Sequence, residues 1–299
     1  KRAVIVMCAD NGIVREGISQ SGQEVTLAVA QSMGRRESSV CRMASASHTD
    51  VIPVDIGIAA SCKIDGVLDE KIACGTRNFA KEPAMTEKET LDAIDTGVRL
   101  VKQCKENGYQ ILATGEMGIG NTTTSSAVTA ALLHRLASET AGRGAGLNDK
   151  GLSRKKQVIQ EAIDRYDLYK ADAFTVLQTV GGFDIAGMCG LMLGGAIYRI
   201  PVVLDGLISL MAALLARKFC PLVTDFLLPS HMGKEPACGM AMETLGLEAS
   251  IYGNLALGEG TGAVMLFPLL DMAEAVYREN STFENIHVDA YQNFEEEQV

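Results

Sequence analysis

The chain has 299 residues, 47% of them hydrophobic, with a formal net charge of −10. This length can bury a sizeable core in one large domain or two. The acidic balance argues against a nucleic-acid partner, because binding a phosphate backbone requires a basic stripe and the sequence contains none. A small-molecule ligand is the better expectation.

The eight cysteines are scattered without a C-x-x-C pair, and most lie in apolar runs. This pattern indicates reduced core thiols in a reducing compartment, so we expect a cytoplasmic protein. The four histidines are also far apart, and the sequence therefore predicts no metal site.

The first strand is predicted over residues 3–9, an apolar run without alternation that stops at Asp10-Asn11-Gly12. Such a run is typical of a strand buried on both faces of a parallel sheet. Similar strands are predicted for residues 51–58, 110–113 and 200–204.

Helical patterns follow these strands. One helix has clear ends, since Thr86 and Glu89 form a capping box and Asn107-Gly108 supply a stop. The apolar stretch 185–216 is interrupted by Arg199, Pro201 and Asp205 before it reaches the ~20 residues of a membrane span. We interpret it as buried core and expect no membrane partner.

A last helical pattern covers residues 262–280, and the tail beyond it is acidic. Alternating strands and helices predict an α/β fold, a Rossmann-like parallel sheet with helices on both faces. Ligands of such sheets bind at the carboxyl ends of the strands, so the loops there are the candidate site.

The first candidate loop, residues 115–124 (GEMGIGNTTT), leads into a helix rich in small residues. Glycines allow close backbone approach, and the first amides of a helix attract anions. The loop is a candidate phosphate or carboxylate cradle. It is not a Walker A loop, and a tight turn with Asn121 or Thr122 as an ordinary N-cap is the alternative.

The second candidate loop, residues 142–149 (GRGAGLND), precedes a basic cluster that includes Lys155. Flexible glycines with a nearby ammonium group suit a phosphate ester. A solvated helix face is the alternative interpretation.

Two glutamates lie between or beside glycines, Glu116 in the first loop and Glu259 in the sequence LGEGTG at 257–262. Partial shielding from water suits a carboxylate to proton transfer near neutral pH or to stabilising a cationic sugar. Each glutamate could instead cap a helix.

Asp205, before Gly206, ends a strand and is favoured as a substrate ligand, although it could also stabilise the turn.

Taken together, these segments resemble the nicotinate-nucleotide:dimethylbenzimidazole phosphoribosyltransferase family. The resemblance runs from about residue 4 to residue 285 in family order, and the combination of GEMGIGNTT with LGEGTGA is specific. The remaining matching segments are residues 23–26, 75–86, 142–155, 181–186 and 200–206.

The resemblance implies transfer of the phosphoribosyl group of nicotinate mononucleotide to 5,6-dimethylbenzimidazole or a similar base. Nicotinate leaves and α-ribazole 5′-phosphate forms, in cobamide biosynthesis. By the same resemblance Glu259 is the catalytic base, and Glu116 orients the base or stabilises the oxocarbenium-like ribose. No cofactor is implied, because nicotinate is itself the activated leaving group.

The resemblance also implies a set of substrate-binding residues. Lys155, Gly144 and Gly146 would hold the 5′-phosphate, and Asp205 and Gly206 would lie near the ribose. Leu257 and Gln23 would border the aromatic base. The residues that would line the nucleotide are Gly118, Gly120, Asn121 and Thr122, with Gly262 completing the set.

The family pattern further implies a homodimer and a small helical domain built from both chain termini. We therefore expect an α/β domain over residues 1–262 and the C-terminal part of the small domain over 263–299, with its N-terminal partner helices missing. The sequence departs from the family pattern at Asn11, Ser21-Gly22 and Met232-Gly233. These changes leave two alternatives: a phenolic or purine acceptor, or a non-catalytic nucleotide-binding protein.

Overall fold

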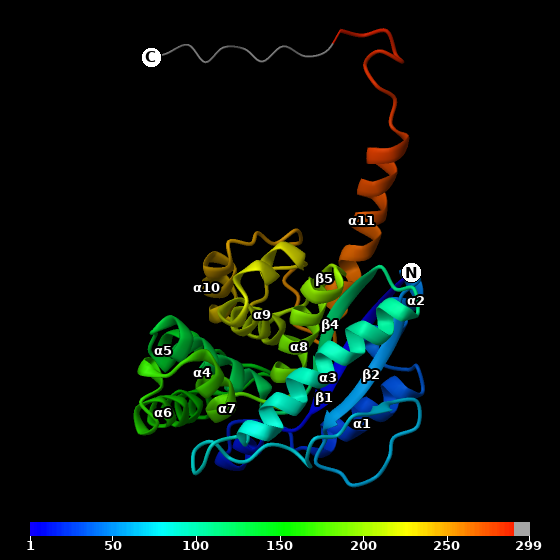
Figure 1. Ribbon diagram of the computed structural model, residues 1–299. Coiled ribbons are helices and arrows are strands. Elements are labelled where there is room, and N and C mark those ends of the chain that lie inside the picture. The colour runs from blue at the N-terminus through cyan, green and yellow to red at the C-terminus, as the bar shows by residue number, and fades with distance from the viewer. Residues whose placement is uncertain (290–299) are drawn as a thin grey trace, which may run out of the picture. The chain divides into compact units, whose positions relative to one another are not determined.

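The computed structural model describes residues 1–289 (Figure 1). The acidic tail, residues 295–297, lies outside the described residues. The chain divides into two units between Leu266 and Phe267. The first unit contains the sheet and the candidate site. Helix α11 (Thr261–Glu279), which was predicted over 262–280, begins in this first unit and continues into the second.

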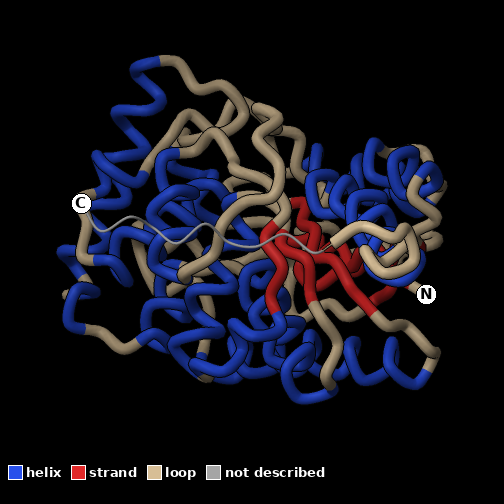
Figure 2. The backbone as a smooth tube through the Cα atoms, turned by 90° about the horizontal axis from the view of Figure 1, so that it is seen from above, coloured by secondary structure: helices blue, strands red, loops and turns tan. Residues whose placement is uncertain are grey.

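A six-stranded sheet forms the centre of the first unit, with strand order β3-β2-β1-β4-β5-β6. Its neighbouring strands pair in parallel. Figure 2 shows the strands lying among the helices. The predicted α/β fold is confirmed. The strands are β1 (Arg2–Ala9), β2 (Asp50–Gly57), β3 (Leu68–Asp69), β4 (Ile111–Met117), β5 (Val202–Leu204) and β6 (Leu227–Pro229).

The remaining α-helices connect and cover these strands. They are α1 (Glu24–Gly34), α2 (Ser39–Ala46), α3 (Glu87–Glu106), α4 (Asn121–Leu133), α5 (Ala137–Thr140), α6 (Asp149–Arg165), α7 (Ala173–Val180), α8 (Phe183–Tyr198), α9 (Leu207–Phe219) and α10 (Pro236–Leu245). Short 3-10 turns lie at Gly12–Glu16, Leu168–Lys170 and Pro221–Phe226.

The central strand β1 is buried on both faces, as its apolar run predicts. Successive side chains of a strand point to opposite faces. Ile5 and Met7 enter the main core, while Val4 and Val6 are fully buried on the other face. Helices α8 and α9 pack against the sheet, and α1 and α2 contact β2.

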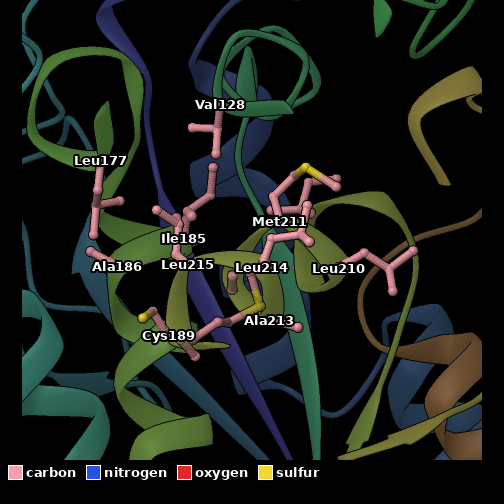
Figure 3. Close-up of a cluster of buried hydrophobic side chains, with 14 of the residues drawn as sticks. Val128, Leu177, Ile185, Ala186, Cys189, Leu210, Met211, Ala213, Leu214 and Leu215 are labelled. Atoms are coloured by element: carbon pink, nitrogen blue, oxygen red, sulfur yellow. The ribbon is translucent and has the colours of Figure 1, made fainter. Parts of the chain in front are cut away.

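The main core is formed largely by α8 and α9, together with α4 and α7. In Figure 3 Ile185 and Cys189 from α8 lie among Met211 and Leu214 from α9, near Val128 from α4. The apolar stretch 185–216 is thus mostly buried core, as predicted, although Ile197 within it is exposed. Within residues 1–289 no helix is long and apolar enough to cross a membrane.

Helix α3 begins and ends where the sequence predicts. The Thr86 hydroxyl accepts a hydrogen bond from the Glu89 amide at 3.2 Å, and the Glu89 carboxylate accepts one from the Thr86 amide at 2.7 Å. The helix ends before Asn107, and Gly108 has a φ of 80°.

The third predicted strand is longer than expected. Gly115 and Glu116, assigned to a loop from the sequence, belong to β4, where they pair with Val6 and Met7 of β1. Strands β3 and β6 were not predicted: β3 has two residues, and β6 has three and ends at Pro229, whereas the equally short β5 lies in a longer apolar run. Short strands leave too few residues for a recognisable pattern.

The strand order reverses between β1 and β4. Chain order runs outward from β1 to β3 on one side and from β4 to β6 on the other. In open parallel sheets, ligands bind outside the carboxyl ends of the strands at this switch point. The carboxyl ends of β1 and β4 are therefore the expected ligand site.

Candidate active site

A cavity of about 760 Å³ opens at the carboxyl ends of β4 and β5. Its walls come from the segments that follow these strands, from residues 18–20, from the 141–147 loop, from the segment between β6 and α10, and from the segment before α11. The structure thus brings together most of the predicted site. The predicted residues that line the cavity are Glu116, Gly118, Gly120, Asn121, Thr122, Gly144, Asp205, Gly206 and Leu257.

Five predicted residues are not part of this lining, as far as the described chain shows: Gln23, Gly146, Lys155, Glu259 and Gly262. Gln23 is the N-cap residue of α1. Gly146 lies in the glycine loop with a φ of 99°, and its carbonyl accepts a hydrogen bond from Gln20, which does line the cavity. Lys155 is hydrogen-bonded to the lining residue Thr122, while Glu259 and Gly262 are sequence neighbours of the lining residues Gly258 and Thr261.

Glu116 is the penultimate residue of β4, and its carboxyl group faces a second acidic residue. The Asn121 side-chain amide donates to Glu116 Oε2 and, at 3.1 Å, to Asp184 Oδ2. Asp184 lies in the first turn of α8 and is fully buried. One amide therefore holds two carboxyl groups close together.

This arrangement changes the acidity of both groups. Burial, reinforced by the negative charge of Asp184, raises the pKa of Glu116 to about 8. Burial also raises the pKa of Asp184 to about 6, although its hydrogen bonds from Asn121 and the Ile185 amide oppose the change. Glu116 can consequently take up or release a proton near neutral pH.

Asp205 is tied to the beginning of α11. Its carboxylate accepts hydrogen bonds from the amides of Gly260 and Ala263, both at 3.1 Å. Burial raises the pKa of Asp205, while the nearby His231 and these amides favour the charged form. A carboxylate at a helix N-terminus is stabilised by the helix dipole. Asp205 therefore positions the LGEGTG segment as well as lining the cavity.

His231 also lines the cavity, and its ring orientation is fixed by Ser230. The Ser230 hydroxyl donates to the Leu204 carbonyl at 2.6 Å and lies 2.9 Å from His231 Nδ1. Because a carbonyl can only accept, Ser230 must accept from Nδ1–H, which leaves Nε2 available for a ligand. Gly262 makes room for the ring, since a Cβ there would lie 2.0 Å from Nδ1.

Glu259 has an unusual backbone and points toward α2. Its φ is 61°, and the flanking Gly258 and Gly260 also have positive φ values. The Glu259 carboxylate accepts a hydrogen bond from the Val40 amide in the first turn of α2 at 3.1 Å. A left-handed non-glycine residue costs about 1 kcal/mol or more and is found preferentially at functional sites.

Lys155 lies beneath the glycine loop. It is fully buried, and its ammonium group donates to Thr122 Oγ1 at 3.0 Å and to the Gly142 carbonyl at 3.1 Å. Burial lowers its pKa to about 8, against the opposing charge of Glu235. Three further cations, Arg143, Lys156 and Lys234, line the cavity itself.

Three lining or supporting residues were missed from the sequence: Asp184, His231 and Glu235. Asp184 lies in the segment 181–186 that matches the family pattern, but nothing local marks it as a partner of Glu116. His231 is isolated from other histidines in the sequence. Glu235 precedes Pro236 at the start of α10 and looks like an ordinary helix start. Only the tertiary fold brings these residues to the cavity.

The described residues hold no group of three or more His, Cys, Asp or Glu side chains arranged to bind a metal ion. The cavity is instead lined by carboxyl groups of Glu116, Asp205 and Glu235, by the cations Arg143, Lys156 and Lys234, and by glycines. Such a cavity suits a ligand with both a cationic centre and an anionic group.

Comparison with known proteins identifies the fold and the family. A family model described as "Phosphoribosyltransferase" matches residues 1–288. The nicotinate-nucleotide–dimethylbenzimidazole phosphoribosyltransferase of Acetivibrio thermocellus is 44% identical over 292 residues, covering 98% of this chain and 83% of that protein. The enzyme of the same name from Clostridium perfringens is 40% identical over 289 residues, covering 97% and 80%.

Solved structures agree with this result. The crystal structure of CobT from Thermus thermophilus matches with a TM-score of 0.92 and 36% identity, covering 97% of this chain and 86% of that one. A second Thermus thermophilus structure of the phosphoribosyltransferase matches with a TM-score of 0.91 and 35% identity, with the same coverage. The chain belongs to the nicotinate-nucleotide–dimethylbenzimidazole phosphoribosyltransferase family.

Proposed function

We propose that this chain transfers the phosphoribosyl group of nicotinate mononucleotide to 5,6-dimethylbenzimidazole or a similar base. Nicotinate is released and α-ribazole 5′-phosphate is formed, in cobamide biosynthesis. Besides family membership, one observation carries the proposal. The glycine loop over Lys155 and the carboxyl groups of Glu116 and Asp205 converge on a single cavity.

The charges of the cavity fit the donor. Nicotinate mononucleotide carries a positive pyridinium nitrogen at the anomeric carbon and a phosphate at the other end of the ribose. Carboxyl groups favour the pyridinium and the oxocarbenium-like ribose that forms from it, while glycine amides and lysine favour the phosphate. A cationic ligand would also favour ionisation of Glu116, whose pKa is raised to about 8 by burial and by Asp184.

The proposed reaction is a single displacement that inverts the anomeric carbon. A benzimidazole nitrogen forms the new bond to this carbon as the bond to nicotinate breaks. The electron pair of the broken bond leaves with nicotinate. The other benzimidazole nitrogen loses its proton to a base, for which Glu259 is the candidate. To act so, the Glu259 carboxylate must leave the Val40 amide and turn into the cavity. Glu116 would orient the incoming base or stabilise the ribose.

The proposed contacts of the donor come from lining residues and from four predicted residues outside the lining. Lys155, Gly144 and Gly146 would hold the phosphate, and Asp205 with Gly206 would face the ribose. Leu257, which is 59% exposed, and Gln23 would border the aromatic base. The remaining nucleotide contacts would come from Gly118, Gly120, Asn121 and Thr122, and Gly262 would complete the set by making room for His231.

We further propose that residues 263–299 contribute to a small helical domain beside an α/β domain of residues 1–262, and that the protein acts as a homodimer. A cytoplasmic location is proposed because all eight cysteines are free thiols and five of them are buried. Sedimentation of the purified protein would test the dimer.

The function is tested by incubating the protein with nicotinate mononucleotide and 5,6-dimethylbenzimidazole, and by measuring nicotinate release and the α-ribotide. Parallel reactions with a phenol and with adenine test the alternative acceptors. These matter because the sequence departs from the family pattern at Asn11, Ser21-Gly22 and Met232-Gly233, and Gly233 lines the cavity. Tight nucleotide binding without nicotinate release for every acceptor would favour the non-catalytic alternative and refute the proposal.

A further inference from the structure

A carboxylate of the protein itself occupies the glycine loop that is proposed to hold phosphate. The Gly144 amide donates to Glu235 Oε1 at 3.0 Å. Glu235 Oε2 is buried and has no hydrogen-bond partner among residues 1–289. The Glu235 carboxylate packs directly on Gly142, since a Cβ at residue 142 would lie 2.1 Å from Glu235 Oε2. Without glycine at 142, this carboxylate could not lie here.

The surroundings of Glu235 are those of an anion site. Lys155 lies behind the same loop, bonded to the Gly142 carbonyl, and the charge of Glu235 favours the protonated form of this lysine. Backbone amides and a nearby ammonium group are also what a phosphate ester uses in proteins. The carboxylate therefore satisfies, in the unliganded protein, the groups that the substrate phosphate would need.

An unpartnered buried carboxylate oxygen is unfavourable. Glu235 thus fills the loop with an incomplete set of hydrogen bonds, whereas a phosphate has three terminal oxygens for the same donors. A dianionic phosphate and a carboxylate would repel each other strongly at one small site. The two anions are consequently alternative occupants of the loop.

We propose that Glu235 competes with the 5′-phosphate for the 142–146 loop and thereby sets how tightly donor and product bind. The inference rests on the proposed function for the identity of the phosphate ester. In the free protein Glu235 accepts from Gly144, and phosphate binding displaces it. When the product leaves, Glu235 returns to Gly144. Donor and product both carry a 5′-phosphate, so the same competition weakens donor binding and speeds product release.

The direct test measures binding of inorganic phosphate by isothermal titration calorimetry to the wild-type protein, Glu235→Gln and Glu235→Ala. Removing the competing charge should tighten phosphate binding about tenfold, which corresponds to about 1.4 kcal/mol. Glu243→Gln is the matched control, because Glu243 is an exposed glutamate of helix α10, which Glu235 precedes. It should bind phosphate as the wild type does.

Phosphate binding that is unchanged or weaker in both Glu235 variants, with wild-type circular dichroism, would overturn the proposal. Weaker binding would mean that Glu235 is itself a ligand of the bound phosphoester. The alanine variant separates charge from shape, since glutamine can still accept from Gly144.

A kinetic test adds a second readout. In Glu235→Gln the KM for nicotinate mononucleotide should fall, and single-turnover nicotinate release should exceed steady-state turnover because phosphorylated product leaves slowly. A raised KM with unchanged kcat would contradict the inference. If the wild-type protein releases no nicotinate, the proposed function fails, yet the phosphate titration still decides the role of Glu235.

Discussion

Replacing Glu116 by glutamine should flatten the dependence of stability on pH. Glu116 has a pKa of about 8 in the folded protein against an ordinary value of 4.5. Ionising it in the folded state therefore costs at most about 5 kcal/mol. Because the side chain borders the cavity, water reduces this cost, and we expect about 2 kcal/mol to be measurable.

The direction in which stability changes with pH follows from proton linkage. The folded protein binds the Glu116 proton more tightly than the unfolded chain, so this contribution is fully present below pH 4.5 and is lost as the pH rises to about 8. Asp184, with its pKa raised to about 6, acts in the same direction over a lower range. Lys155 acts in the opposite direction and at higher pH, because burial lowers its pKa to about 8, so that its contribution to stability rises with pH above that value. Variants should be compared between about pH 5 and pH 8.

The assay is urea denaturation followed by far-ultraviolet circular dichroism at several pH values in this range. Wild-type protein should lose stability toward pH 8, whereas Glu116→Gln should lose less and become the more stable of the two. Both should be similar at pH 5, where Glu116 is protonated. Glu243→Gln, on the exposed face of α10, is the control. Parallel curves for wild type and Glu116→Gln would refute the reasoning.

Three further variants probe the site. Glu259→Gln should lose most nicotinate release but still bind nucleotide, because glutamine cannot take the proton; calorimetry and a turnover assay measure both. Lys155→Met should raise the KM for nucleotide about tenfold or more, since a charge-assisted contact is lost. Gly262→Ala should lower the free energy of unfolding by about 1–3 kcal/mol, because its Cβ would lie 2.0 Å from His231 Nδ1.

These variants have clear opposing outcomes. Unchanged turnover in Glu259→Gln would remove that residue from the base role. An unchanged KM in Lys155→Met would mean that the buried lysine only supports the glycine loop through its bond to Gly142. Wild-type stability of Gly262→Ala would show that the His231 ring can move aside.

The main strands could be predicted because they are buried on both faces. Residues such as Val4 and Ile5 are equally apolar because both faces of β1 are covered, and this removes the alternation of a surface strand. The end of β4 could not be predicted in the same way. Gly115 and Glu116 are poor strand formers, and they extend the strand because they pair with the neighbouring β1.

The directions in which side chains point within the site could not be predicted from the sequence. Glu259 and Glu116 both follow or lie between glycines, yet only Glu116 lines the cavity, while Glu259 binds the Val40 amide. The direction of Glu259 depends on its left-handed backbone and on the position of α2, which is distant in sequence. Glycine spacing indicated where the backbone turns, but local sequence carries no information about which amide the carboxylate meets.

The interaction of Glu259 with α2 also bears on how the base would be activated. The first-turn amide of α2 stabilises a carboxylate, so leaving it costs free energy that must be recovered elsewhere. An incoming benzimidazole N–H supplies a replacement donor, and the cationic donor nucleotide supplies favourable charge. Glu259 should therefore enter the cavity when both substrates are bound, which keeps the base away from the anomeric carbon until an acceptor is present. Nicotinate mononucleotide alone should then be hydrolysed slowly, and fast hydrolysis without acceptor would contradict this order.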